Sequence, residues 1–122
     1  MGLDMYALTR ASKLPAEVDF AEKPGDAKLH HWRKHPNLHG WMESLYRTKG
    51  GAEPVFNCVN LALSADDLDQ LEADIRSRCL PKTAGFFFGE SDGTENAGDL
   101  DFIAKARDAI AAGLFVYYTS WW

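Results

Sequence analysis

The spacing between hydrophobic residues changes several times along this chain, from the alternation typical of strands to the three- and four-residue spacing typical of helices. That pattern constrains the fold more than any other feature. Over residues 3–9 apolar and polar residues alternate, which indicates a strand with one buried face. Further on, apolar residues recur at helical spacing. This second stripe consists of Leu38, Trp41, Met42 and Leu45. Because Pro36 suits the first turn of a helix, we predict a helix over residues 36–47.

Strand and helix patterns continue to alternate in the rest of the chain. Residues 18–20 predict a short second strand that could pair with the first. Ser64 and Asp67 have the spacing of a capping box, so a helix is expected to begin after Ser64 and to end before Pro81. The other expected elements are an interior strand over 54–63, a short buried strand over 85–89, a helix over 99–112 and an aromatic closing strand over 114–122.

We expect these elements to form a single α/β or α+β domain over residues 1–122. Helices that alternate with strands bury their apolar sides on a sheet, so we predict three helices on a mixed sheet of four to five strands. The chain length is close to the commonest domain size. Since 46% of the residues are hydrophobic, the core needs no disulfide or metal. We therefore expect Cys58 and Cys79 to be reduced, buried thiols.

The charge pattern argues against several classes of partner. The net charge is −5, with basic residues concentrated over 23–49 and acidic residues over 64–112. An acidic chain is a poor general nucleic-acid binder, because the phosphate backbone attracts positive charge. No apolar stretch is long enough for a membrane helix, and the first residues do not form a signal peptide. We therefore expect a cytoplasmic protein that binds neither nucleic acid nor membrane.

Aromatic and basic residues near the middle of the chain suggest a pocket for a small anionic ligand. Aromatic faces can stack on a base or ring, while cations meet phosphate or carboxylate. The alternative is that both tryptophans anchor the core and the cations extend along the surface into solvent. The candidate ligand-binding residues are Trp32, Arg33, Lys34, His39, Trp41 and Tyr118.

Two surfaces could instead bind a macromolecular partner. The helix after Ser64 is acidic and could present a negative face to a basic protein, although such charge runs are usually solvated. The candidate partner-binding residues on it are Asp66, Asp67, Asp69 and Glu72. The closing strand has aromatic residues on both faces, so it is either central in the sheet or leaves an exposed aromatic contact surface.

We predict neither a metal site, nor a cofactor, nor a catalytic residue. His31, His35 and His39 recur every four residues, but Pro36 prevents them from sharing one helix. Residues 90–95 do not match a calcium loop, and we expect a solvated loop there. We also expect no phosphate-binding glycine loop, no Gly-x-Ser-x-Gly elbow and no His-Glu-x-x-His zinc motif.

Four blocks of sequence together resemble a family of small uncharacterised proteins encoded by bacteriophages and bacterial genomes. The blocks are the start Met-Gly-Leu-Asp-Met-Tyr, the segment from Trp32 to Trp41, the run from Gly85 to Gly89 and the ending from Tyr117 to Trp121. The resemblance implies a phage or prophage setting and supplies no mechanism. The family pattern maps to Trp32, Arg33, Lys34, His39, Trp41, Tyr117 and Tyr118. The additional histidines, His30, His31 and His35, depart from it.

Two functions are therefore expected as alternatives. The first is a noncatalytic interaction protein of phage or prophage origin, for example an inhibitor of a host defence system, with a protein partner on its acidic or aromatic surface. The second is a protein that binds or processes a small, nucleotide-like anion. The second requires Arg33 and His39 to converge in one pocket, whereas the first requires a flat acidic or aromatic surface.

Overall fold

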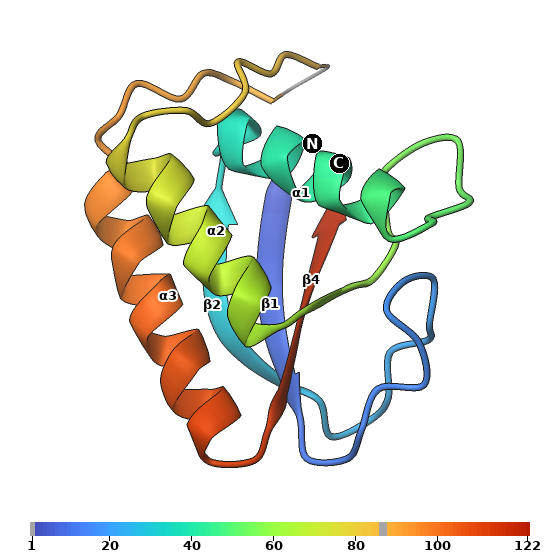
Figure 1. Ribbon diagram of the computed structural model, residues 1–122. Helices are drawn as coiled ribbons and strands as arrows, with labels where there is room; N and C mark the ends of the chain where they lie inside the picture. Colours follow the sequence, from blue (N-terminus) through green and yellow to red (C-terminus); the bar gives the residue numbers. More distant parts are fainter. Residues whose placement is uncertain (1, 86–87) are drawn as a thin grey trace.

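Four strands form one antiparallel sheet in the order β2-β1-β4-β3 (Figure 1). The computed structural model describes residues 2–85 and 88–122. The strands are β1 (Asp4–Arg10), β2 (Ala27–Arg33), β3 (Leu61–Leu63) and β4 (Phe115–Trp121). The two central strands, β1 and β4, pair along their whole length, from Asp4 opposite Trp121 to Arg10 opposite Phe115. The aromatic closing strand is therefore central in the sheet.

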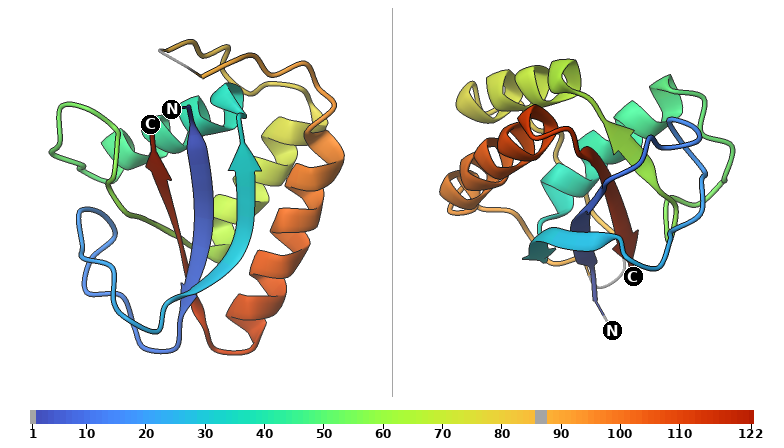
Figure 2. Two further views of the ribbon diagram at one scale, coloured as in Figure 1. Left: turned by 180° about the vertical axis from the view of Figure 1, so that it is seen from behind. Right: turned by 90° about the horizontal axis from the view of Figure 1, so that it is seen from below.

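Three helices cover one face of this sheet (Figures 1 and 2). They are α1 (Pro36–Thr48), α2 (Ala65–Arg76) and α3 (Asn96–Ala111). Helices α2 and α3 lie side by side, and α1 crosses one end of the sheet. The structure confirms the α+β class, the three helices and the four strands. Every neighbouring strand pair in the described part of the chain is antiparallel.

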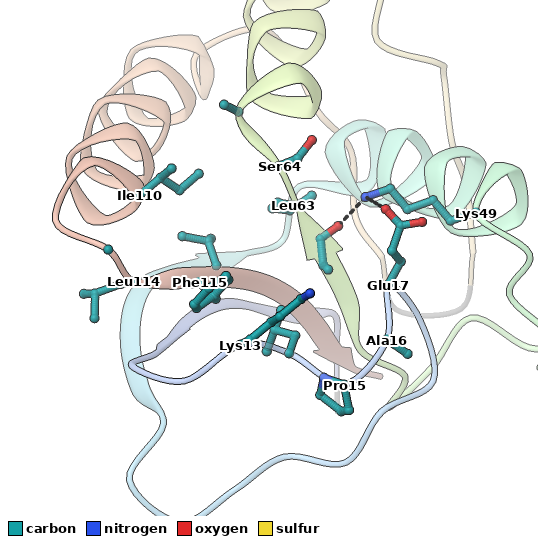
Figure 3. Close-up of a pocket in the computed structure, with 15 residues that line it drawn as sticks. Lys13, Pro15, Ala16, Glu17, Lys49, Leu63, Ser64, Ile110, Leu114 and Phe115 are labelled. Atoms are coloured by element: carbon teal, nitrogen blue, oxygen red, sulfur yellow. Dashed lines mark hydrogen bonds and ion pairs between the residues drawn. The ribbon is translucent and has the colours of Figure 1, made fainter.

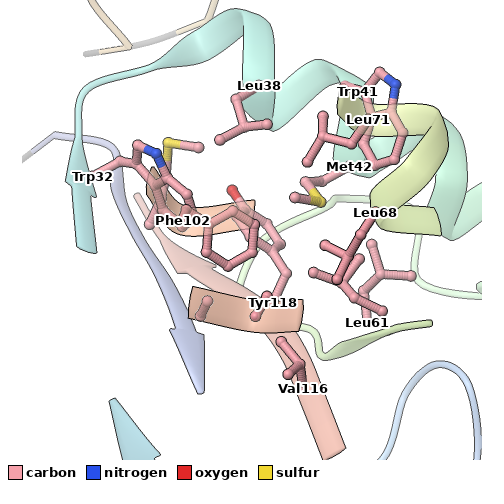
Figure 4. Packing of buried hydrophobic residues seen from close by; sticks show 14 of the residues in the cluster. Trp32, Leu38, Trp41, Met42, Leu61, Leu68, Leu71, Phe102, Val116 and Tyr118 are labelled. Carbon is pink, nitrogen blue, oxygen red and sulfur yellow. The ribbon is translucent and has the colours of Figure 1, made fainter. Parts of the chain in front are cut away.

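The main core lies between the helices and the sheet (Figure 4). Alternate residues of the central strands face the helices because successive side chains of a strand point to opposite faces. The helices contribute the stripes predicted from their spacing. The core residues that Figure 4 labels are Trp32, Leu38, Trp41, Met42, Leu61, Leu68, Leu71, Phe102, Val116 and Tyr118. A smaller cluster on the other face contains Leu8, Phe20 and Tyr117.

The capping box at the start of α2 is confirmed. Ser64 Oγ accepts a hydrogen bond from the backbone N–H of Asp67 at 3.2 Å, and the Asp67 carboxylate accepts one from the N–H of Ser64 at 2.8 Å. Both bonds satisfy N–H groups that a helix start leaves without a partner. The predicted start of α1 at Pro36 is also confirmed.

Several predicted strands differ from the structure. Residues 18–20 form no strand, and Val18 makes an isolated bridge to Leu61 rather than pairing with β1. The hairpin partner of β1 is β2. Because β2 is a mostly exposed edge strand, its sequence does not show the alternation of apolar and polar residues that predicts a strand. Of the segment 54–63 only Leu61–Leu63 is a strand. The strand predicted over 85–89 includes residues 86 and 87, which lie outside the described residues.

The predicted burial of the two cysteines is wrong, since both thiols are free and exposed. Cys79 follows α2 at the surface, and Cys58 lies in the irregular segment before β3. Cys79 lies outside the core because α2 ends before it, at Arg76. Cys58 lies outside the core because β3 begins after it, at Leu61.

Candidate active site

Three polar side chains from separate parts of the chain meet beside the N-termini of α1 and α3. His35 immediately precedes α1, Ser91 lies in the loop before α3, and Asp99 lies in the first turn of α3. His35 Nδ1 is 2.7 Å from Ser91 Oγ, and His35 Nε2 is 2.7 Å from Asp99 Oδ2. The imidazole therefore links a hydroxyl group to a carboxylate.

The buried carboxylate of Asp99 fixes the orientation of the imidazole. Asp99 is 0% exposed and His35 is 3% exposed. Trp32 Nε1–H donates a second hydrogen bond to the Asp99 carboxylate, at 3.0 Å from Oδ1. Burial of a carboxylate is costly without such donors. Because the carboxylate accepts both bonds, His35 Nε2 carries a proton, and Nδ1 is the ring nitrogen that remains to accept one.

A backbone amide sets the direction of the Ser91 hydrogen bonds. The N–H of Asn37, in the first turn of α1, is 3.1 Å from Ser91 Oγ. This N–H can only donate, so Ser91 Oγ accepts it, and the Ser91 O–H points to His35 Nδ1. The chain of bonds runs in one direction, from Ser91 to His35 to Asp99. A hydroxyl, an imidazole and a carboxylate linked in this order can act as nucleophile, general base and orienting group. The two ring nitrogens are exchanged relative to the Ser-His-Asp triad, in which Nε2 faces the hydroxyl.

Two glycines shape the loop around Ser91. Gly89 and Gly93 have φ angles of +71° and +92°, a region that other residues enter only with strain. The segment from Gly89 to Gly93 reads Gly-Glu-Ser-Asp-Gly, which fits the Gly-x-Ser-x-Gly pattern. The expectation that the chain lacks this pattern is therefore wrong. In its usual context the serine sits on a turn from a strand directly into a helix, whereas here α3 begins only at Asn96.

A small cavity opens beside Ser91 and His35. Its volume is about 200 Å³, below the usual range for drug-sized ligands. The residues that line it include the apolar Ile75 and Leu80, and also Arg78 and Asn96, whose side chains carry hydrogen-bond donors. The cavity is thus suited to a small chemical group next to the hydroxyl.

The structure separates the residues predicted to form an anion pocket. Arg33 Nε pairs with the Asp4 carboxylate at 3.0 Å, and its side chain is 47% exposed. Trp41 is almost buried and donates its Nε1–H to Asp74 at 2.8 Å. Lys34 is half-buried and follows Arg33 beyond the end of β2. Arg33 and His39 therefore do not converge in one pocket, and Trp32 and Trp41 act as core anchors.

His39 and Tyr118 do meet, but inside the core. His39 Nδ1 is 2.6 Å from the Tyr118 hydroxyl, and the residues are 2% and 0% exposed. Burial lowers the pKa of His39 to about 4, although a hydrogen bond to the Phe56 carbonyl opposes that shift. Burial also raises the pKa of Tyr118 well above its ordinary value. Hence His39 is neutral and accepts from the Tyr118 hydroxyl, and the pair is a buried structural contact.

Basic side chains neutralise most of the predicted acidic face of α2. Asp67 binds Lys49 Nζ at 2.6 Å. The carboxylate of Asp69 lies 2.7 Å from Arg107, and Glu72 pairs with both Arg107 and Arg76. Asp66 is exposed at the start of α2. The predicted surface is therefore a mixed-charge network rather than a uniformly negative face.

A larger cavity lies at the opposite end of α3 (Figure 3). It has a volume of about 500 Å³, and apolar residues such as Leu63, Ile110 and Phe115 line most of it. Its inward-facing ammonium group, Lys49 Nζ, is bound to the carbonyl of Ala62 at 2.7 Å and to Asp67. Ser64 and Lys13 also line this cavity, but its lining residues include no histidine, so it lacks the pairing of a hydroxyl with an imidazole found beside Ser91.

Three further observations bear on the site. No group of three or more His, Cys, Asp or Glu residues that could hold a metal ion is found in residues 2–85 and 88–122. Within the same residues, no helix is long and apolar enough to cross a membrane. Comparison of the chain with protein-family models, with curated proteins and with solved structures finds no match.

Proposed function

We propose that this protein is a hydrolase that cleaves small esters or related acyl compounds through an acyl intermediate on Ser91. The observation that supports the proposal most is the hydrogen-bond chain from Ser91 through His35 to Asp99. A serine hydroxyl is a weak nucleophile unless a base removes its proton. Here the base is within reach, and a buried carboxylate orients it.

In the first half of the proposed reaction, Ser91 Oγ attacks the carbonyl carbon of the substrate. Its proton moves to His35 Nδ1, and the imidazolium that forms is stabilised by Asp99. The bond between the carbonyl carbon and the leaving alcohol oxygen then breaks. His35 returns the proton to that oxygen, which leaves an acyl group on Ser91.

In the second half, water replaces the alcohol. His35 Nδ1 accepts a proton from the water as its oxygen attacks the acyl carbon, and the proton then returns to Ser91 Oγ as the carboxylic acid leaves. Negative charge develops twice on the carbonyl oxygen. Asn96, which has a side-chain amide N–H, lines the cavity, and the positive end of the α3 dipole lies at the same place, so both can stabilise that charge.

A serine-directed fluorophosphonate probe tests this proposal. We expect the wild-type protein to be labelled, with the mass increase on the peptide that contains Ser91. Ser91→Ala should abolish labelling, while Ser44→Ala, at an exposed serine of α1, should label like the wild type. Asp99→Asn should slow labelling by at least about a hundredfold, because the imidazole loses its orienting carboxylate. Circular dichroism establishes that each variant is folded.

The probe experiment has clear contrary outcomes. Absence of labelling in a folded wild-type protein would refute the proposed function. Equal labelling of the wild type and Ser91→Ala would also contradict it, because the reactive residue would then lie elsewhere.

A second candidate function is interaction with a macromolecular partner through an aromatic surface. Trp121 is 72% exposed. It lies on the sheet face that the helices leave uncovered, since it is three positions after the core residue Tyr118 and successive side chains of a strand alternate between faces. A phage or prophage origin, a cytoplasmic location and inhibition of a host defence system remain part of this proposal. Its test compares the proteins captured by the wild type and by Trp121→Ser, and equal capture of the same partner contradicts the aromatic contact.

A further inference from the structure

We propose that Arg78 makes the Ser91 site selective for short acyl groups that end in a carboxylate. This inference rests on the proposed function and adds the substrate class. The cavity beside Ser91 is lined by that serine, by the apolar residues Ile75 and Leu80, and by Arg78. A substrate that uses all three features has a reactive carbonyl, a short apolar chain and a terminal anion.

The end of α2 places Arg78 at this cavity. After the cap residue Ser77, the chain reverses through Arg78, whose φ angle is +58°. The N–H of Arg78 donates to the carbonyl of Ile75 at 3.1 Å, and the N–H of Cys79 donates to the carbonyl of Asp74 at 2.8 Å. These two bonds define a Schellman turn, in which glycine is the usual residue at the left-handed position.

An arginine at this left-handed position is unfavourable for the backbone. Glycine adopts a positive φ without a steric penalty, whereas a residue with a Cβ is strained there. Such strain is often found at functional sites, where a particular side chain is required. The presence of Arg78 is therefore better explained by its side chain than by the turn.

The charge partners of the arginines also distinguish Arg78. Each of the other arginines forms an ion pair with a carboxylate; they are Arg10, Arg33, Arg47, Arg76 and Arg107. Within the described part of the chain, Arg78 forms no ion pair with a carboxylate. A guanidinium group binds a carboxylate through two parallel hydrogen bonds, so Arg78 can supply that contact to a ligand.

The acidic residues near the site do not neutralise Arg78. The carboxylate of Asp99 is buried and accepts from His35 and Trp32. Glu95 lies 3.9 Å from His35 Nδ1 and accepts from the backbone N–H of Asp92 at 2.9 Å. Neither Asp99 nor Glu95 lines the cavity. A carboxylate of the substrate therefore meets Arg78 without a competing anion in the cavity wall.

The test compares two esters whose acyl chains have the same number of carbons, 4-nitrophenyl hemisuccinate and 4-nitrophenyl butyrate. We expect the wild type to prefer the hemisuccinate in kcat/KM. Arg78→Gly should reduce the ratio of the two kcat/KM values by about tenfold or more, since a hydrogen bond to a charged group is lost. Arg76→Ala removes a positive charge from the same helix end outside the cavity and should leave the ratio unchanged.

Arg78→Gly also separates a binding role from a structural one. Because glycine removes the left-handed strain, we expect the variant to be at least as stable as the wild type in thermal unfolding. A lower preference for hemisuccinate in a stable variant supports the inference. An unchanged ratio in Arg78→Gly overturns it.

A binding experiment keeps this inference distinct from the proposed function. Succinamate, which carries a carboxylate and an uncleaved amide carbonyl, is titrated into the protein, and NMR shifts of the backbone amides around Arg78 and Ser91 are followed. Shifts in the wild type that are lost in Arg78→Gly support the anion site even without turnover. If Ser91 is labelled by the fluorophosphonate probe but succinamate causes no shifts, only the inference about Arg78 fails.

Discussion

The buried pair of His39 and Tyr118 leads to a quantitative prediction for stability in acid. In the folded protein the pKa of His39 is about 4, against 6.5 for an unperturbed histidine. The folded state thus favours neutral His39, and the unfolded chain binds a proton first as the pH falls. The contribution of neutral His39 is fully present above pH 6.5 and is lost as the pH falls from 6.5 toward 4. Between pH 7 and pH 4.5 the loss is about 2.5 kcal/mol.

Denaturant unfolding at both pH values measures this loss. Other groups titrate in the same range, so the wild type is compared with His39→Gln, whose amide stays neutral. The free energy of unfolding of the wild type should fall by about 2.5 kcal/mol more than that of His39→Gln on going from pH 7 to pH 4.5. The variant itself has lower stability at pH 7, because a flexible amide replaces a well-packed ring between Phe56 and Phe88.

Parallel losses in the two proteins would refute the reasoning. That result would mean that His39 takes up a proton in the folded state as readily as in the unfolded chain. Burial of the ring, which outweighs the opposing hydrogen bond to the Phe56 carbonyl, would then not keep His39 neutral.

Two further predictions concern stability alone. Ser64→Ala should reduce the free energy of unfolding by about 1 kcal/mol, because the N–H of Asp67 loses its acceptor; an unchanged denaturation midpoint would exclude the capping box as a stabilising contact. Trp121→Ser should change the free energy of unfolding by less than about 0.5 kcal/mol, because the indole is largely exposed; a larger loss in thermal or denaturant unfolding would place Trp121 in the core rather than on a contact surface.

Local sequence signals predict the elements that have a strong periodic face. The spacing around Leu38 predicts α1, and the capping box at Ser64 predicts the start of α2. Strand β2 lacks such a signal, since it is an edge strand with Trp32 as its one buried residue. Its pairing with β1 depends on the connection between the two strands rather than on its own pattern, so periodicity alone places the partner of β1 wrongly at residues 18–20.

The candidate site depends on contacts that no local pattern encodes. Ser91 is separated from His35 by 56 positions in sequence, and Asp99 is separated from His35 by 64. The Gly-x-Ser-x-Gly pattern at residues 89–93 was the one available signal for the serine. Nothing in the sequence around His35 identifies it as the partner of Ser91. The imidazole lies between the Ser91 hydroxyl and the Asp99 carboxylate only because the fold brings the end of β2 next to the start of α3.

Ordinary packing does not account well for the hydrogen-bond chain. A buried carboxylate and imidazole lose solvation on folding, and replacement of such groups by apolar residues is often neutral or stabilising. Ser91 is half-buried at the cavity, so its hydroxyl is accessible while Asp99 is not. A purely structural link between α1 and α3 requires no accessible hydroxyl at one end. A nucleophile requires an accessible hydroxyl together with a buried carboxylate that orients its base. Ser91→Ala distinguishes a catalytic role from a structural one, because it removes the hydroxyl without disturbing the contact between His35 and Asp99.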